Sequence, residues 1–152
     1  RFESRGLGDV YKRQVLFARG ATACTDVTGF GLLGHLVEMA RPSEVDVELD
    51  LNALPLLDGA LDCVRNGIFS SLQPQNVRLR RAIRADSNGG RESELLPLIF
   101  DPQTAGGLLA TVPEAEAEGC VDALHEAGYP TATVVGQILP QSNHLEPITL
   151  LG

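Results

Sequence analysis

The sequence predicts a single α/β domain in which helices pack against a sheet. Segments of β-prone residues alternate with segments of helical period along the 152 residues, and such alternation is typical of layered α/β domains. Residues 45–50 alternate strictly between apolar and acidic side chains, as in a half-buried strand. Residues 22–39 pass from a β-prone stretch through a glycine-containing turn into a helical pattern. A chain of this length can bury one hydrophobic core.

The first residues do not fit this pattern. Residues 1–14, RFESRGLGDVYKRQ, show no helical or strand period, and their last nine resemble a translated sequencing adaptor more than a protein segment. We therefore expect them to be a non-native leader that packs poorly and has no element continuous with the domain. Phe2, Val10 and Tyr11 should then lie outside the core, and the natural domain would span residues 15–152.

Residues 22–39, TACTDVTGFGLLGHLVEM, combine the features of an anion site. The small, β-prone residues 22–25 predict a short buried strand, and the helix that follows has one apolar face formed by Leu32, Leu33, Leu36, Met39 and Ala40. The first turn of a helix has free N–H groups and a positive dipole end, and Gly29 and Gly31 let the backbone approach a ligand closely. Asp26 stands where a metal ligand would lie beside a phosphate. An ordinary turn, with Asp26 or a threonine as the N-cap, is an equally weighted alternative.

Further elements follow from local signals. Arg41-Pro42-Ser43 should end the first helix, and residues 45–50 should form a strand with Val45, Val47 and Leu49 inward and the intervening acidic residues outward. Pro55 should open a second helix that ends at Asn66-Gly67, its apolar face consisting of Leu56, Leu57, Ala60, Leu61 and Val64.

Residues 67–92 have no clear period, and residues 87–90 indicate a turn. They hold a basic cluster in an otherwise acidic chain, Arg78, Arg80, Arg81, Arg84 and Arg91. Binding of phosphate by this cluster is one interpretation, but we favour a solvated helix face.

The C-terminal third starts with an apolar run, residues 95–100, that leads into Asp101-Pro102. Residues 108–112 predict a strand. Thr111 and Glu114 match a capping box, with Pro113 in the first turn of a third helix, whose apolar face is Ala117, Cys120, Val121 and Leu124 and which ends at Gly128 and Pro130. Residues 131–139 and 148–151 predict the last two strands.

Composition excludes several classes of protein. No apolar run reaches the ~18 residues of a membrane span, and no signal peptide is visible, so we expect no membrane partner. A net charge of −8 argues against nucleic-acid binding. The three cysteines, Cys24, Cys63 and Cys120, are widely spaced and form no CxxC pair, which argues against a disulfide framework or a zinc site and favours a reducing, cytoplasmic location.

Two strings carry a resemblance to a known family. Residues 25–39, TDVTGFGLLGHLVEM, and residues 101–109, DPQTAGGLL, resemble signature elements in the C-terminal domain of selenophosphate synthetases. The second element also occurs in the wider superfamily of PurM-like, ATP-using enzymes related to aminoimidazole ribonucleotide synthetase. The resemblance covers about residues 15–152. It implies an α+β fold with a mixed sheet and packed helices, like the C-terminal domain of the PurM-like fold.

The resemblance also implies a chemistry. Selenophosphate synthetases convert selenide, ATP and water to selenophosphate, AMP and phosphate with the help of Mg²⁺, and we expect a cytoplasmic homodimer. Their reactive residue and most metal-binding aspartates belong to an N-terminal domain that we expect to be missing here, so we expect no catalytic residue in this chain and no activity of the chain alone. Cys24 does not match the reactive residue of the family.

Matching residue by residue, Asp26 corresponds to a magnesium-binding aspartate, and Thr28, Gly29 and Gly31 correspond to the turn that could line the phosphate site. Thr104, Gly106 and Gly107 are weaker candidates for ligand contact than for packing, and Ala105 replaces the usual serine. His35 and Glu38 should satisfy each other structurally rather than act in catalysis, and His125 and His144 receive no role.

Two alternatives remain open at this point. One is another PurM-superfamily enzyme, such as aminoimidazole ribonucleotide synthetase or thiamine monophosphate kinase. The string at residues 25–39 argues against this alternative. The other is a non-catalytic nucleotide-binding or interaction module. The upstream coding sequence would distinguish them, because it would show or lack the reactive residue and a glycine-rich run.

Overall fold

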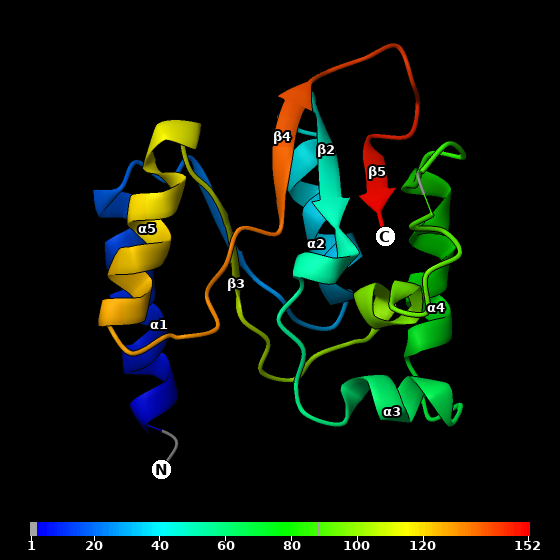
Figure 1. Cartoon of the computed structure of the whole chain (residues 1–152), viewed down its shortest axis with the longest axis horizontal. Helices are drawn as coiled ribbons and strands as arrows, with labels where there is room; N and C mark the ends of the chain where they lie inside the picture. The colour runs from blue at the N-terminus through cyan, green and yellow to red at the C-terminus, as the bar shows by residue number, and fades with distance from the viewer. Residues whose placement is uncertain (1–2, 88) are drawn as a thin grey trace. The chain divides into compact units, whose positions relative to one another are not determined.

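The computed structural model describes residues 3–87 and 89–152, with side chains described from Val10 onward. Phe2, which we expected outside the core, and Asn88 of the expected turn lie outside the described residues. The chain divides into two compact units (Figure 1). Unit 1 contains the residues up to Asp26 and Gly107–Val134, and unit 2 contains Val27–Gly106 and Val135–Gly152.

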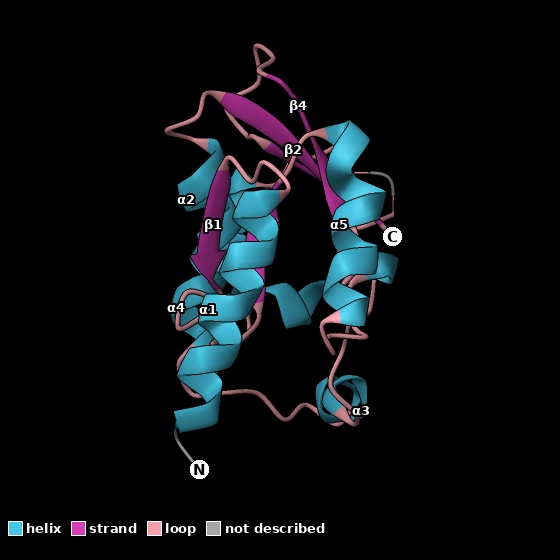
Figure 2. Cartoon of the chain, turned by 90° about the vertical axis from the view of Figure 1, so that its left-hand side faces the viewer, coloured by secondary structure: helices cyan, strands magenta, loops and turns pink. Residues whose placement is uncertain are grey.

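Unit 1 consists of two helices and a two-stranded antiparallel sheet. Strand β1 (Ala23–Asp26) pairs with β3 (Leu108–Thr111), with Ala23 opposite Thr111 and Asp26 opposite Leu108. Helices α1 (Glu3–Ala18) and α5 (Glu114–Glu126) are in contact (Figure 2). Among the side chains of this unit that the structure describes, the buried ones are Leu16, Leu109 and Cys120. As predicted, α5 ends before Gly128, which has a φ of +92°.

The expectation that residues 1–14 have no element continuous with the domain is wrong. Helix α1 runs without a break from Glu3 into Ala18, because arginine, leucine, lysine and glutamine favour helices and Leu16 buries its side chain. Val10 and Tyr11 are 53% and 52% exposed, as expected.

Unit 2 is built on a mixed three-stranded sheet in the order β4-β2-β5. Strand β2 (Val45–Asp50) pairs antiparallel with β4 (Gly136–Pro140) and parallel with β5 (Ile148–Leu151). Helix α2 (Gly31–Ala40) contacts β2, and the core side chains include Leu33, Leu36, Ala40, Val47, Leu49, Ile148 and Leu150. This mixed sheet with packed helices confirms the α+β class.

Short helices connect these elements. They are η1 (Leu51–Ala53), α3 (Ala60–Arg65), α4 (Gln73–Val77), η2 (Arg78–Ala82) and η3 (Leu96–Phe100), where η denotes a 3₁₀ helix. The prediction that Pro55 opens the second helix is wrong. Gly59, with a φ of +81°, delays the start to Ala60, and Leu56 and Leu57 are 40% and 85% exposed.

Several local predictions need correction because tertiary contacts override local patterns. Residues 22–25 are half-buried or exposed rather than buried. Asp46 is buried although its strand alternates. Thr111 does not cap α5, because its hydroxyl pairs with the Thr22 hydroxyl at 2.8 Å. In residues 131–139 only the second half joins a strand. No helix of the described residues is long and apolar enough to cross a membrane.

Candidate functional site

The two sequence motifs meet within unit 2, where the loop that precedes α2 lies against the segment that follows η3. The N–H of Gln103 donates to the Thr28 carbonyl at 3.0 Å. A Cβ on Gly106 would collide with the Val27 carbonyl, so only glycine fits there. Gly31 has a φ of +70°, and a Cβ on it would lie 2.9 Å from the Ile99 carbonyl oxygen. Glycine is required at both positions because the two backbones approach so closely.

Asn76 joins the first motif to the end of η3, directly before the second motif, and sequence reasoning did not identify it. Its side-chain amide donates to the Gly29 carbonyl at 2.9 Å and to the Phe100 carbonyl at 3.0 Å. The residue is only 6% exposed. One turn earlier on α4, the Gln73 amide donates to the Pro97 carbonyl at 2.8 Å. A buried amide that serves distant carbonyls leaves no periodic signal in a sequence, so no local pattern could have revealed this role.

His35 fixes Thr28 from the other side. The Thr28 N–H donates to His35 Nε2 at 3.0 Å, and the Thr28 hydroxyl lies 3.1 Å from the same nitrogen. Because Nε2 accepts, the ring proton belongs on Nδ1, which lies 3.4 Å from a Glu38 carboxylate oxygen. At that distance Nδ1 forms no hydrogen bond in the described part of the chain, so Glu38 does not satisfy His35 as we expected. With Nε2 as acceptor, the Thr28 N–H occupies the single lone pair of that nitrogen and is not free for a phosphate.

Gly29 is the member of the loop with open space on the side where a side chain would be, although its carbonyl accepts a hydrogen bond from Asn76. It is exposed, and a Cβ there would have no heavy atom within 4 Å. Gly31, in contrast, donates its N–H to the Thr28 carbonyl at 3.0 Å. Among the sequence candidates of this loop, Gly29 therefore offers the best approach for a ligand, while Thr28 and Gly31 shape the turn.

Asp26 ends β1 in unit 1 and does not cap α2. The N-cap of α2 is Phe30, and no side chain caps the helix, so the N-cap alternative for Asp26 and Thr28 is wrong. The Asp26 carboxylate accepts a hydrogen bond from the Arg13 guanidinium at 2.6 Å. Both side chains are nearly half exposed, 43% for Arg13 and 49% for Asp26.

The residues of this chain do not form a complete metal site. The described residues contain no group of three or more histidines, cysteines, aspartates or glutamates that could hold a metal ion. Magnesium at phosphate sites is often held by only one or two carboxylates together with substrate oxygens. Asp26 therefore fits as one of the several ligands of such a site, and the Arg13 guanidinium balances the charge of its carboxylate here.

The remaining candidates of the second motif differ in their surroundings. Thr104 and Ala105 are exposed in unit 2. Gly107 is exposed in unit 1, and a Cβ there would meet no neighbour within 4 Å. Burial raises the pKa of the Asp101 carboxyl group. Gly106 thus serves packing, whereas Thr104 and Gly107 are accessible.

Cys24 is not poised as a nucleophile. Burial is the main cause that raises the pKa of its thiol; Arg13 opposes that shift and Asp26 adds to it. A raised pKa leaves the thiol protonated near neutral pH, and the thiolate is the reactive form. This agrees with the expectation that Cys24 does not match the family's reactive residue.

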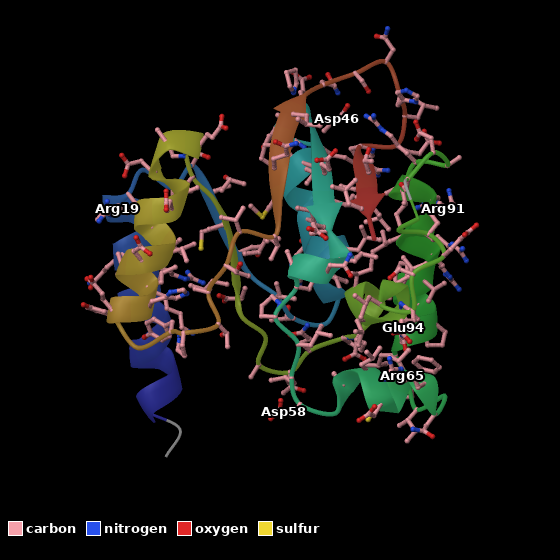
Figure 3. The ribbon with its side chains drawn as sticks, in the orientation of Figure 1. Arg19, Asp46, Asp58, Arg65, Arg91 and Glu94 are labelled. Carbon is pink, nitrogen blue, oxygen red and sulfur yellow. The ribbon has the colours of Figure 1, made fainter. Side chains whose placement is uncertain are left out.

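The arginine cluster separates into three environments rather than one solvated helix face. Arg84 is 14% exposed in its side chain and forms an ion pair with Asp46, which lies on β2 (Figure 3). Arg91 donates to the Ile83 carbonyl at 3.4 Å. Arg78, Arg80 and Arg81 are exposed, as the favoured interpretation predicted for the whole cluster.

Comparison with known proteins adds independent information. The profile of the family described as "AIR synthase related protein, C-terminal domain" matches residues 9–145. The chain is 42% identical over 124 residues to a protein of Geobacter metallireducens named selenide, water dikinase, covering 82% of this chain and 35% of that protein. A protein of the same name from Clostridium botulinum, strain Eklund 17B, is 35% identical over 141 residues, covering 92% and 39%. One from Caldanaerobacter subterraneus is 38% identical over 122 residues, covering 78% and 34%. The chain thus spans between 34% and 39% of the length of these three relatives.

Proposed function

The chain belongs to the family of AIR synthase related proteins, whose C-terminal domain it matches, and we propose that it is the C-terminal part of a selenide, water dikinase. Such an enzyme makes selenophosphate from selenide, ATP and water and releases AMP and phosphate. The observation that carries the proposal is the close packing of the two motifs, TDVTGFG and DPQTAGG, through Asn76, Gln103 and the two required glycines.

This packing supports a role in ATP binding. The loop before α2 is held by His35, Asn76 and Gln103, so its conformation is fixed before a ligand arrives. Gly29 presents an exposed backbone just before the first turn of α2. Because helix N-termini attract phosphates, we assign the loop at Gly29 to the phosphate groups of ATP, with Thr28 and Gly31 setting its shape. Thr104 and Gly107 are secondary candidates, and Gly106 acts in packing.

Asp26 would supply one carboxylate oxygen to magnesium, and the other ligands would come from outside this chain and from the nucleotide. Magnesium would neutralise phosphate charge during the transfer. Because the Asp26 carboxylate accepts a hydrogen bond from Arg13, metal binding would require Arg13 to release it.

The remaining parts of the proposal concern the whole protein. A further domain would supply the reactive residue and most metal ligands, and the complete enzyme would be a cytoplasmic homodimer. Residues 1–14 would be a leader foreign to the natural protein, although their backbone continues a helix. The family profile already matches from residue 9, so its match includes residues 9–14 of this leader.

Selenium incorporation in cells tests the proposed function. The chain would replace the matching C-terminal part of the Geobacter metallireducens relative, and the chimaera would be expressed in bacteria that lack their own selenide, water dikinase. We expect radioactive selenium from selenite to enter protein, as it does with the intact relative, whereas the chain by itself should give no incorporation. A folded chimaera that restores none would contradict the proposal.

A further inference from the structure

An apolar groove on unit 2 lies outside the proposed nucleotide site. It has a volume of about 450 Å³ and is lined by α4 with Val77, by η3 with Leu96 and Phe100, and by Phe69 between α3 and α4. A second hollow of about 170 Å³ shares Phe69 and other lining residues with the first. The two hollows therefore adjoin each other, and we refer to them together as the depression.

The walls of this depression are held in place by hydrogen bonds. The Gln73 and Asn76 amides of α4 donate to the Pro97 and Phe100 carbonyls of η3, which fixes the two short helices against each other. The groove is thus formed before any partner binds. The side-chain oxygen of Gln73, a residue 5% exposed, has no hydrogen-bond partner in the described part of the chain. An unsatisfied buried acceptor is costly, and a donor from an occupant would relieve it.

Large apolar side chains are exposed around the depression. Ile68 is 63% exposed, Leu72 is 55%, Phe69 is 49% and Val77 is 39%. Single exposed apolar residues are normal on protein surfaces, but a contiguous set beside a groove marks a binding surface. Ile68 lines the second hollow and Phe69 lines both, so the exposed apolar surface extends over the two hollows.

Among the described residues, the main groove has one charged lining residue, an arginine, whereas Asp101 lines the second hollow. Residues 66–85 contain four arginines and no aspartate or glutamate, in a chain of net charge −8. Arg80 lines the groove, and Arg78 and Arg81 are exposed on the same 3₁₀ helix. Within the described part of the chain, no ion pair involves these three arginines, whereas Arg84 is paired with Asp46.

We propose that this groove docks an acidic amphipathic peptide segment of a partner protein. Two apolar side chains would fill the two hollows, as in helix-in-groove recognition, and a carboxylate beside the one in the main groove would face Arg80. Aromatic and arginine residues are the side chains that carry most binding energy at interfaces. This proposal does not depend on the assignment of the proposed enzyme activity.

Fluorescence polarisation with synthetic peptides tests the proposal on the full 152-residue chain. The acidic probe would be a labelled helical peptide of about four turns with two leucines on one face and glutamates flanking them. Matched peptides would replace the glutamates by glutamine or by lysine. We expect the acidic peptide to bind at least tenfold more tightly than the glutamine peptide, to lose affinity with added salt, and the lysine peptide not to bind.

Variants of the chain locate the binding. Arg80→Glu should weaken binding of the acidic peptide at least tenfold, and Phe69→Ala should weaken binding of both the acidic and the glutamine peptide. Arg41→Glu, which changes an exposed arginine away from the groove, is the matched control and should leave affinity within about twofold of the unchanged chain. Circular dichroism would verify that each variant folds.

Four outcomes would overturn the proposal. They are no binding of the acidic peptide at about 1 mM, equal binding of the glutamine peptide, unchanged affinity of the folded Arg80→Glu variant, and tighter binding of a single-stranded RNA oligonucleotide than of any peptide. Sedimentation provides a further arm, because self-association abolished by Arg80→Glu would identify a second copy of the chain as the occupant instead.

Discussion

Replacing Asp46 by alanine should destabilise unit 2 strongly, because it breaks a buried ion pair. The Asp46 carboxylate accepts hydrogen bonds from the Arg84 guanidinium and from the Ser142 N–H, the latter at 2.9 Å. Arg84 also donates to the Glu146 carbonyl at 2.9 Å and to the Ser142 hydroxyl at 2.7 Å. The two charged side chains are 5% and 14% exposed, so this pair joins β2 to the β4–β5 connection away from solvent.

The structure sets the expected size of the effect. Removing one partner of a buried ion pair costs about 3–5 kcal/mol, because the other charge stays buried without compensation. The lower end applies here, since Arg84 keeps the Glu146 carbonyl and the Ser142 hydroxyl as acceptors. A loss of about 3 kcal/mol corresponds to a fall in Tm of roughly 6–12 °C for a domain of this size.

Thermal and urea unfolding would measure the change in the free energy of unfolding. The matched control is Glu94→Ala, because Glu94 pairs with Arg65 on the surface at 2.8 Å (Figure 3). Exposed ion pairs contribute little, so this control should leave the free energy of unfolding almost unchanged. An Asp46→Ala variant as stable as Glu94→Ala would refute the reasoning.

Three further predictions follow from the same contacts. Burial alone would raise the pKa of the Asp46 carboxyl group, but hydrogen bonds from Ser142 and Arg84 outweigh burial and hold that pKa below its ordinary value. The folding stability that the lowered pKa contributes is complete above the unfolded-state pKa of about 4 and is lost as the pH falls through the lower folded-state pKa. Urea melts from pH 5 downward should show an acid loss that Asp46→Asn lacks, and parallel curves would contradict it. Asn76→Ala removes the donor to the Gly29 and Phe100 carbonyls. It should lower the free energy of unfolding by about 1–3 kcal/mol and speed hydrogen exchange in the loop before α2. The control Gln75→Ala, at an exposed position, should do neither, and equal effects of the two variants would argue against the bridging role. Gly31→Ala, at a φ of +70° beside the Ile99 carbonyl, should lower stability by more than about 1 kcal/mol, while Gly107→Ala, with open space at its Cβ, should not, as calorimetry would show.

Regular elements with a periodic core face could be predicted from the sequence. Helix α2 and strand β2 follow patterns that local burial enforces, and Leu33, Leu36, Val47 and Leu49 are buried as expected. The start of α3 was predicted wrongly. The apolar pattern begins at Leu56, but Gly59 adopts a left-handed conformation and the helix starts only after it. Helix α1 was missed because residues 1–14 were set aside as a foreign leader, although the helix is as amphipathic as α2.

The candidate site could be predicted only where its residues form contiguous motifs. The loop at Gly29 and the segment at Gly106 were identified as strings, and their packing against each other is a property of the fold. Asn76 is 47 residues from Gly29 in sequence, and its amide reaches that carbonyl only after folding. Arg13 and Asp26 are 13 residues apart, and no pattern in the sequence indicated that they pair. Long-range polar contacts of this kind leave no local signature.

The most direct test of the central claim is the rate of AMP release from ATP by the purified chimaera, measured against selenide concentration. We expect the rate to rise with selenide and to saturate. Asp26→Asn should reduce it by about 10²–10³ across a magnesium titration, since removing one stabilising electrostatic contact commonly costs that much. AMP release that is absent or independent of selenide in the folded chimaera would contradict the assignment of the chain to a selenide, water dikinase. Full activity of Asp26→Asn would contradict the role of Asp26 at the metal.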